Sequence, residues 1–119
     1  MDKVNIEEKL DLISKHYSPH IVGELNGQFV KLVKFRGPFT WHHHDNEDEM
    51  FLVIKGEFVM ELKDRNVELN EGEFIIIPKG VEHRPVAENE VHVLLFEPNT
   101  TLNTGNVRNE FTIENLPKL

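Results

Sequence analysis

Hydrophobic residues recur along most of this chain in short runs that are separated by turn-forming residues. After residue 19 the runs are HIVGEL, QFVKLVKF, FTWHHH, MFLVIK, EFVMELK, NVEL, EFIIIP and VHVLLFE. Asn26-Gly27, Lys55-Gly56 and Glu88-Asn89 are among the separators. Short runs rich in Val, Ile and Phe with turn signals between them are typical of antiparallel all-β domains. The pattern therefore predicts about eight strands in a jelly roll or small barrel.

Only the N-terminal segment has a helical period. Apolar residues follow one another there at spacings of three or four positions, namely Ile6, Leu10, Ile13 and Tyr17. Asn5 with Glu8 resembles a capping box, which marks the start of a helix. Pro19 cannot continue one. The sequence therefore predicts a short N-terminal helix over residues 6–15.

Composition narrows the class of protein. With 119 residues, we expect a single domain spanning residues 1–119. There is no cysteine, which excludes disulfides and thiolate metal sites. A formal net charge of −8 disfavours nucleic acid as a partner, because a phosphate backbone requires clustered positive charge. No signal peptide or membrane-spanning run is evident, so a cytoplasmic protein that does not bind membranes is expected.

The stretch WHHHDNEDEM, residues 41–50, concentrates groups that bind metals. Side chains alternate faces along a strand, so His42 and His44 would point to one side and His43 to the other. The acidic residues that follow favour a turn, and a chain reversal there would bring a carboxylate back to face the histidine pair. Spacing alone does not choose among Glu47, Asp48 and Glu49.

A second cluster lies downstream in GEFIIIPKGVEHRP, residues 72–85. A tight turn precedes a strand, Pro78-Lys79-Gly80 ends it, and His83 begins the next run. Gly80 relieves backbone strain in that turn. If the two clusters lie on facing strands, His83 completes a set of three histidines and one carboxylate.

These two stretches resemble the motifs of a single-domain cupin. The first motif, residues 37–56, reads His-x-His, four residues, Glu, six residues, Gly, and is matched by His42, His44, Glu49 and Gly56. The second, residues 72–87, reads Gly, five residues, Pro-x-Gly, two residues, His, and is matched by Gly72, Pro78, Gly80 and His83. Gly37 stands one position closer to His42 than is usual, and Ala87 replaces an asparagine. Neither departure affects a metal ligand of the family.

The resemblance implies a cupin jelly-roll β-barrel with one divalent transition metal ion, Fe, Mn, Ni, Cu or Zn, bound by His42, His44, Glu49 and His83. The chain is similar to small cupins loosely described as phosphomannose-isomerase-like. We therefore expect a small metalloenzyme that acts by Lewis-acid chemistry on an oxygen-rich molecule, such as a sugar derivative or a hydroxy or keto acid. The alternatives are a dioxygenase and a non-catalytic module that binds metal and a small ligand. The sequence identifies no catalytic residue.

Other residues receive simpler interpretations. Lys79 and Arg84 either hold an anionic group beside His83 or are solvated surface charges. His43 is expected at a structural or subunit contact, and His92 in the core or at an interface. The runs HIVGEL and QFVKLVKF carry more apolar residues than one barrel exterior should expose, which, with the fold resemblance, predicts a homodimer.

Overall fold

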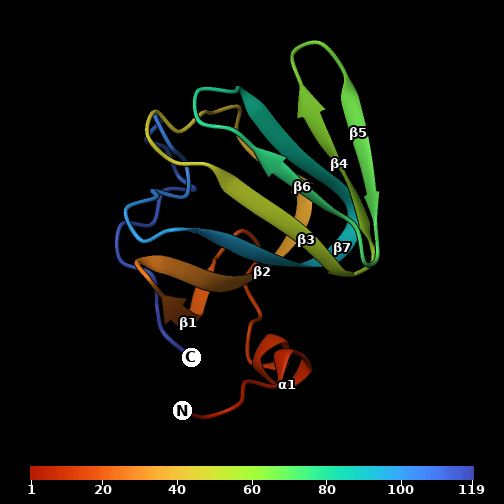
Figure 1. Cartoon of the computed structure of the whole chain (residues 1–119). Coiled ribbons are helices and arrows are strands. Elements are labelled where there is room, and N and C mark those ends of the chain that lie inside the picture. Colours follow the sequence, from red (N-terminus) through yellow and green to blue (C-terminus); the bar gives the residue numbers. More distant parts are fainter.

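Seven antiparallel strands and one short helix make up the structure (Figure 1), a computed structural model that describes residues 1–119. The elements are α1 (Ile6–Asp11), β1 (His20–Leu25), β2 (Gln28–Pro38), β3 (Glu49–Lys55), β4 (Glu57–Leu62), β5 (Asn66–Asn70), β6 (Phe74–Ile77) and β7 (His83–Pro98). The predicted all-β class with a short N-terminal helix is confirmed. The only helix has six residues and is too short to cross a membrane.

The sheet has the strand order β1-β2-β7-β3-β6, and β4 pairs with both β5 and β7. β7 changes partner along its length: residues 83–86 pair with β4 and residues 92–96 with β3, while β2 pairs with both halves. The prediction of a turn at Glu88-Asn89 is wrong, because β7 continues through these residues. These exposed residues instead lie where the pairing with β2 shifts register, so the strand passes from one side of the barrel to the other.

The segment FTWHHH, residues 39–44, is not the strand that its sequence predicted. It has no ladder with a neighbouring strand, and only an isolated bridge joins His42 to His83. The structure consequently has seven strands, one fewer than expected. Asn106, after β7, hydrogen-bonds to the backbone of His43 in this segment.

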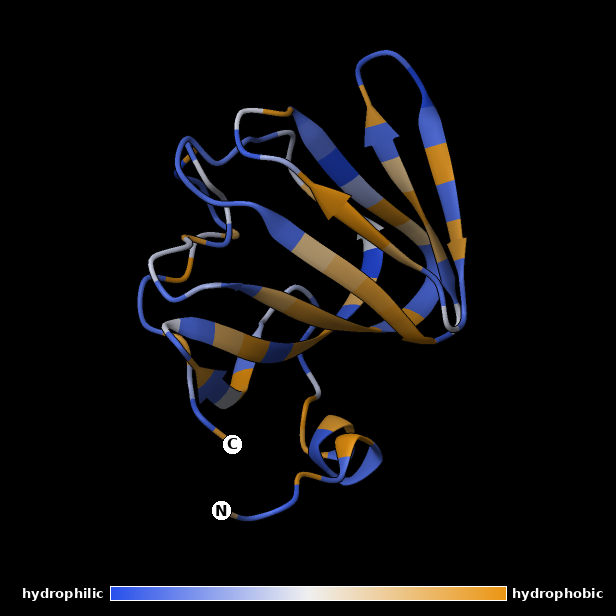
Figure 2. Ribbon diagram, viewed as in Figure 1, coloured by the Kyte–Doolittle hydropathy of each residue, from blue (hydrophilic) through white to orange (hydrophobic).

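The core fills the space inside the curved sheet, as the alternation along the strands predicts. On β3 and β7 the inward residues are apolar and buried, and they are Phe51, Val53, Val91, Val93 and Leu95. Hydrophobic residues accordingly occupy much of β3, β7 and β6 (Figure 2). Tyr17 joins this core and stacks on Phe35 and Phe39, with ring centroids 4.9 and 4.6 Å apart.

Helix α1 is shorter than predicted because the apolar residues of the N-terminal segment pack into two separate clusters. Leu10 and Ile13 pack on Leu32, on the outer side of β2, whereas Tyr17 enters the inner core. A continuous helix would keep Ile13 and Tyr17 on one face. The helix therefore ends at Asp11, and Tyr17 has a positive φ of 55°.

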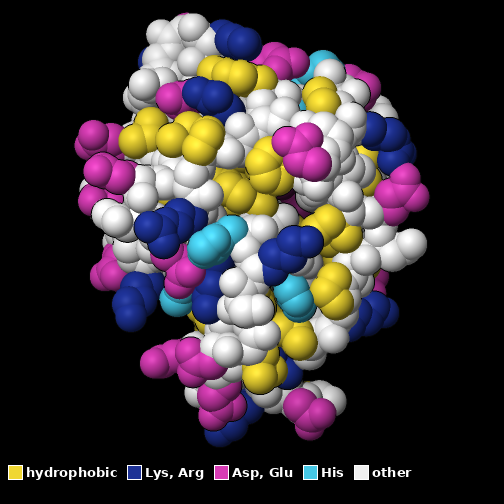
Figure 3. All heavy atoms as spheres, turned by 180° about the vertical axis from the view of Figure 1, so that it is seen from behind, with side chains coloured by type: hydrophobic (Ala, Val, Ile, Leu, Met, Phe, Trp, Pro, Cys, Tyr) yellow, Lys and Arg dark blue, Asp and Glu magenta, His cyan; other side chains and the backbone are white.

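The outer surface differs from expectation in where its apolar residues lie. Many of the apolar residues on β1 and β2 that were expected to be exposed are covered. Leu32 is fully buried beneath α1. Phe74 and Ile76 are instead 60% and 55% exposed on β6, which pairs with β3 alone and forms a sheet edge. Seen from behind, the molecule mixes acidic and basic side chains with scattered apolar ones (Figure 3).

Candidate metal centre

Three histidines and one glutamate converge inside one end of the barrel. They are the predicted residues His42, His44, Glu49 and His83, and one potential ligand atom from each lies within 4.8 Å of the others. All four side chains are buried, with exposed fractions of 4% or less. Glu49 Oε1 lies 3.3 Å from His44 Nε2 and 3.4 Å from His83 Nε2. This group could hold a metal ion.

The chain reversal after His44 selects one acid from the three that the sequence left open. Glu49 is the first residue of β3 and points inward, at 4% exposure. Glu47 instead accepts a hydrogen bond from the Thr100 hydroxyl at 2.8 Å, outside the histidine cluster. Asp48 accepts one from the Lys79 N–H at 2.8 Å. Glu49 is therefore the only carboxylate of the three that faces the histidines.

Backbone hydrogen bonds orient two of the imidazole rings. His42 Nδ1 lies 2.9 Å from the Thr40 carbonyl, and His83 Nδ1 lies 2.9 Å from the Val81 carbonyl. A neutral ring that donates from Nδ1 leaves a lone pair on Nε2. This arrangement commonly orients histidines that bind metals.

Several buried polar atoms of the cluster have no hydrogen-bond partner. They are both ring nitrogens of His44, Nε2 of His83 and Oε1 of Glu49. The approaches of Glu49 to the two rings lack hydrogen-bond geometry, so they leave these atoms unpaired. Buried polar atoms are nearly always paired, and each exception requires an explanation. A cation among these atoms would satisfy ligand groups from three residues together, so the donor set fits a metal ion.

The protonation states also suit metal binding, which requires neutral imidazoles and an ionised carboxylate. Burial, reinforced by the neighbouring His83, lowers the pKa of His42 to about 4. Burial raises the pKa of Glu49, but the close approach of Glu97, His44 and His83 outweighs this and holds it well below the usual value. At neutral pH His42 is therefore neutral and Glu49 is ionised.

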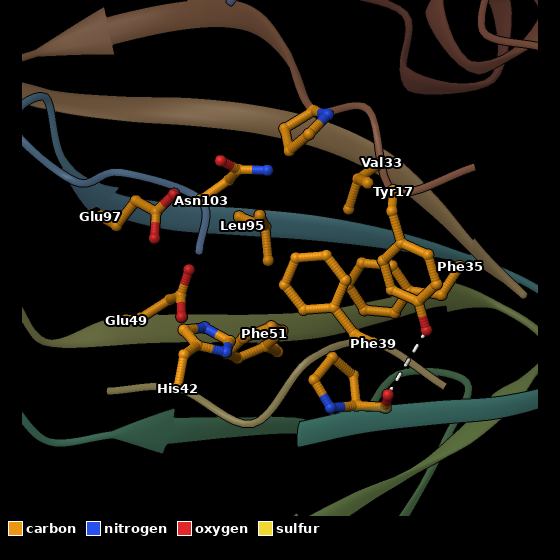
Figure 4. Close-up of a pocket in the computed structure, with 12 residues that line it drawn as sticks. Tyr17, Val33, Phe35, Phe39, His42, Glu49, Phe51, Leu95, Glu97 and Asn103 are labelled. Carbon is orange, nitrogen blue, oxygen red and sulfur yellow. Dashed lines mark hydrogen bonds between the residues drawn. The ribbon is translucent and has the colours of Figure 1, made fainter. Parts of the chain in front are cut away.

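A small cavity of about 30 Å³ adjoins the cluster. Its polar side chains, His42, Glu49, Glu97 and Asn103, gather at one end, and the rings of Tyr17, Phe35 and Phe39 form the other (Figure 4). Burial raises the pKa of Tyr17, whose hydroxyl donates to the Gly37 carbonyl at 2.6 Å. The cavity is thus apolar and aromatic except where it meets the cluster.

The sequence interpretation missed a buried ion pair beside Glu49. Lys31 Nζ lies 2.6 Å from Glu97 Oε1, and both side chains are 1% exposed. Burial and the charge of Glu49 hold the pKa of Glu97 well above the usual value, although Lys31 opposes this. Glu97 Oε2 has no partner. Glu97 could have been found, because it continues the inward alternation of Val91, Val93 and Leu95.

The remaining predicted residues lie away from the cavity. His43 faces outward, as expected, and its ring contacts Glu82 at 2.6 Å and Asp45 at 2.9 Å; the hydrogen bond with Glu82 is the main cause of its raised pKa. Lys79 is exposed. Arg84 binds Glu61 at 2.6 Å and does not line the cavity, so neither cation is placed to hold an anion there.

His92 is neither fully buried nor without a partner. It contacts Glu90 at 3.1 Å, and His16 contacts the same carboxylate at 2.7 Å. These hydrogen bonds, the one from His16 first, lower the pKa of Glu90. The three residues form a polar cluster on the outside of the barrel, apart from the candidate metal centre.

Comparisons with known proteins agree with this architecture. Residues 31–97 match the family model described as Cupin domain. A cupin-2 domain containing protein from Shewanella frigidimarina is 41% identical, with a TM-score of 0.79 over 81% of this chain and 94% of that chain. Protein NMB1881 from Neisseria meningitidis is 29% identical, with a TM-score of 0.76 over 82% of this chain and 100% of that chain.

A sequence relative is the uncharacterized protein YdbB of Bacillus subtilis, which is 34% identical over 73 residues, or 60% of this chain. The match spans 65% of the length of YdbB. The cupin family model covers more than half of this chain, including both motifs and all four residues of the cluster. The chain therefore belongs to the cupin family.

Proposed function

We propose that this protein binds one divalent transition metal ion through His42, His44, Glu49 and His83. The observation that carries the proposal is the convergence of these four buried residues, one ligand atom from each lying within 4.8 Å of the others. Buried atoms of His44, Glu49 and His83 also lack hydrogen-bond partners. Imidazole and carboxylate donors suit Fe, Mn, Ni, Cu or Zn. Four protein ligands leave a coordination position for a small molecule when the ion is five- or six-coordinate.

The proposed activity is that of a small metalloenzyme acting on an oxygen-bearing small molecule. A bound ion would supply Lewis-acid polarisation of a substrate oxygen. The cavity is small, about 30 Å³, and half of the residues that line it are hydrophobic, so the substrate would be small and would direct its oxygen atoms toward the polar end. Glu97 and Asn103 lie at its polar end and would face the polar group of such a substrate.

A dioxygenase is the second candidate, and the apolar wall formed by Phe35, Phe39 and Phe51 supports it. Such a wall suits O2 and an apolar substrate better than a strongly hydrated one. The two candidates differ in one measurable property. A dioxygenase consumes O2 together with its substrate, whereas a Lewis-acid isomerase or lyase does not and should tolerate Zn(II).

The metal proposal is tested by elemental analysis of protein purified without added metal, followed by titration of the apoprotein with Co(II). We expect about one ion per chain, and a visible spectrum that changes when acetate or citrate is added, because an open coordination position admits a carboxylate. A spectrum unchanged by every small oxyanion would support a site that only stabilises the barrel. Failure to bind any ion would refute the proposal.

The proposal includes a homodimer formed through the edge of the sheet at β6. Phe74 and Ile76 are exposed there beside an unpaired strand edge, which proteins commonly protect or use for association. Light scattering should give the mass of two chains, and Phe74→Lys/Ile76→Lys should give that of one. The matched control Glu57→Lys/Glu68→Lys alters exposed residues on β4 and β5 and should remain dimeric. A single-chain mass for the unaltered protein over a wide concentration range would contradict the proposal.

A further inference from the structure

The C-terminal segment, residues 99–119, lies outside the matched domain and packs across the end of the barrel that carries the histidine cluster. It contacts the stretch 39–47 at three places, which are Thr100 with Glu47, Asn106 with His43, and Phe111 with Phe39. The stretch 39–44 meets β7 only at an isolated bridge on one side, so the polar backbone groups on its other side require other partners. The C-terminal segment provides some of them.

Two residues of the histidine triplet are held by elements of the matched domain. His42 exchanges backbone hydrogen bonds with His83, at 3.1 and 2.9 Å. The His44 carbonyl accepts a hydrogen bond from the Gly80 N–H at 2.7 Å. Both motif stretches thus contribute directly to placing these two rings.

His43, between the two candidate ligands, is held by the C-terminal segment instead. Its N–H donates to Asn106 Oδ1 at 2.9 Å, and its carbonyl accepts from the Asn106 N–H at 3.0 Å. Asn106 therefore binds both polar groups of the backbone that links the two rings. Since the His43 backbone connects His42 to His44, fixing it limits how far the two rings can separate.

Gly105 allows this close approach. Its φ is +56°, and a Cβ atom there would lie 2.1 Å from the His43 carbonyl oxygen and 3.1 Å from Cδ2 of the His42 ring. Contacts under 3.0 Å with backbone cannot be relieved by rotating a side chain. Any larger residue would push the C-terminal segment away from His43 or displace the His42 ring.

We infer that Gly105 and Asn106 are positioning residues of the metal centre. The C-terminal segment supplies the backbone partner of His43 and thereby sets the separation of the His42 and His44 rings. This inference rests on the proposed metal site. It extends the site beyond the two cupin motifs to a segment that contributes no ligand.

Asn106 can be altered without releasing the whole segment. The chain is also held at its end, where Leu119 donates a backbone hydrogen bond to Ile21, and in its middle by Phe111 on Phe39 and Tyr17. The Asn106 side chain is exposed and makes one hydrogen bond, whose loss is small beside the stability of a whole domain. An effect on metal affinity can therefore be separated from loss of the fold.

The test measures Co(II) affinity and the visible spectrum of the full chain. Asn106→Ala should weaken Co(II) binding about tenfold, as expected when a group that orients ligands is lost, and should shift the Co(II) bands. Gly105→Ala should weaken it further because the clash is with backbone. Asn106→Asp retains the acceptor for the His43 N–H and should bind Co(II) at least as tightly as the unaltered protein. Asn115→Ala, an exposed asparagine of the same segment, is the matched control.

The outcomes separate this inference from the metal proposal itself. If the unaltered protein binds no Co(II), both fail. If it binds Co(II), and Asn106→Ala and Gly105→Ala bind it as tightly and with the same spectrum, only the positioning role is overturned. Asn106→Ala keeps the test decisive even where Gly105→Ala does not fold. The inference is supported if Asn106→Ala binds Co(II) more weakly, whereas Asn106→Asp and Asn115→Ala bind it as tightly as the unaltered protein.

Discussion

Replacing any one of His42, His44, Glu49 or His83 by alanine should reduce metal affinity by more than about 100-fold. Each change removes an atom from the candidate coordination shell, and groups that only orient ligands already contribute about 10–100-fold. The effect should be similar at all four positions, although they come from β3, β7 and the irregular segment before β3. Competition with a chromophoric chelator, together with elemental analysis, measures it.

His43→Ala is the matched control, because it removes a histidine from the middle of the same triplet. The His43 ring faces Glu82 and Asp45, and the backbone contacts of this residue with Asn106 survive the change. Its metal content should stay close to that of the unaltered protein. Loss of metal from His43→Ala, with retention in His42→Ala and His44→Ala, would mean that the wrong face of the segment has been assigned to the ion.

Glu97→Met should lower the free energy of unfolding of the apoprotein by about 3–5 kcal/mol, the usual cost of breaking a buried ion pair from one side. The change leaves the Lys31 ammonium without its carboxylate at a position that is 1% exposed. Lys31→Met/Glu97→Met should recover most of that loss, because two unbranched apolar side chains then fill the same space. Urea unfolding in the presence of a chelator measures both changes.

The exposed pair of Arg108 and Glu114 provides the control for this experiment. Both side chains are 66% exposed, so solvent screens their attraction. Glu114→Met should therefore change the free energy of unfolding by less than about 1 kcal/mol. A Glu97→Met variant as stable as Glu114→Met would show that Lys31 reaches another partner or water once Glu97 is gone.

Much of the candidate site follows from local sequence because its spacing is short-range. Alternation of side chains separated His42 and His44 from His43, even though the segment is not a regular strand. Because a turn follows His44, spacing did not show which of the three acidic residues after it faces the histidines. Only the motif resemblance selected Glu49. The structure explains that choice physically, since Glu47 and Asp48 pair with residues outside the cluster.

Other features could not be read from local pattern. The run QFVKLVKF is apolar on both faces, so its alternation did not reveal that Lys31 points inward to a glutamate 66 residues away. The end of the helix at Asp11 depends on Ile13 and Tyr17 packing on opposite sides of β2. Local period predicts which residues are buried, but not which of two separate cores receives them.

The sequence by itself determined the all-β class, because strand runs and turns depend on local spacing. The resemblance to the two cupin motifs supplied the four residues of the cluster. Tertiary structure alone decided that FTWHHH makes only an isolated bridge to β7, that β7 continues through Glu88-Asn89, and that Asn106 holds the His43 backbone. These features depend on contacts between segments far apart in the chain. Such contacts arise only when the closed barrel brings the segments together, so no local pattern encodes them.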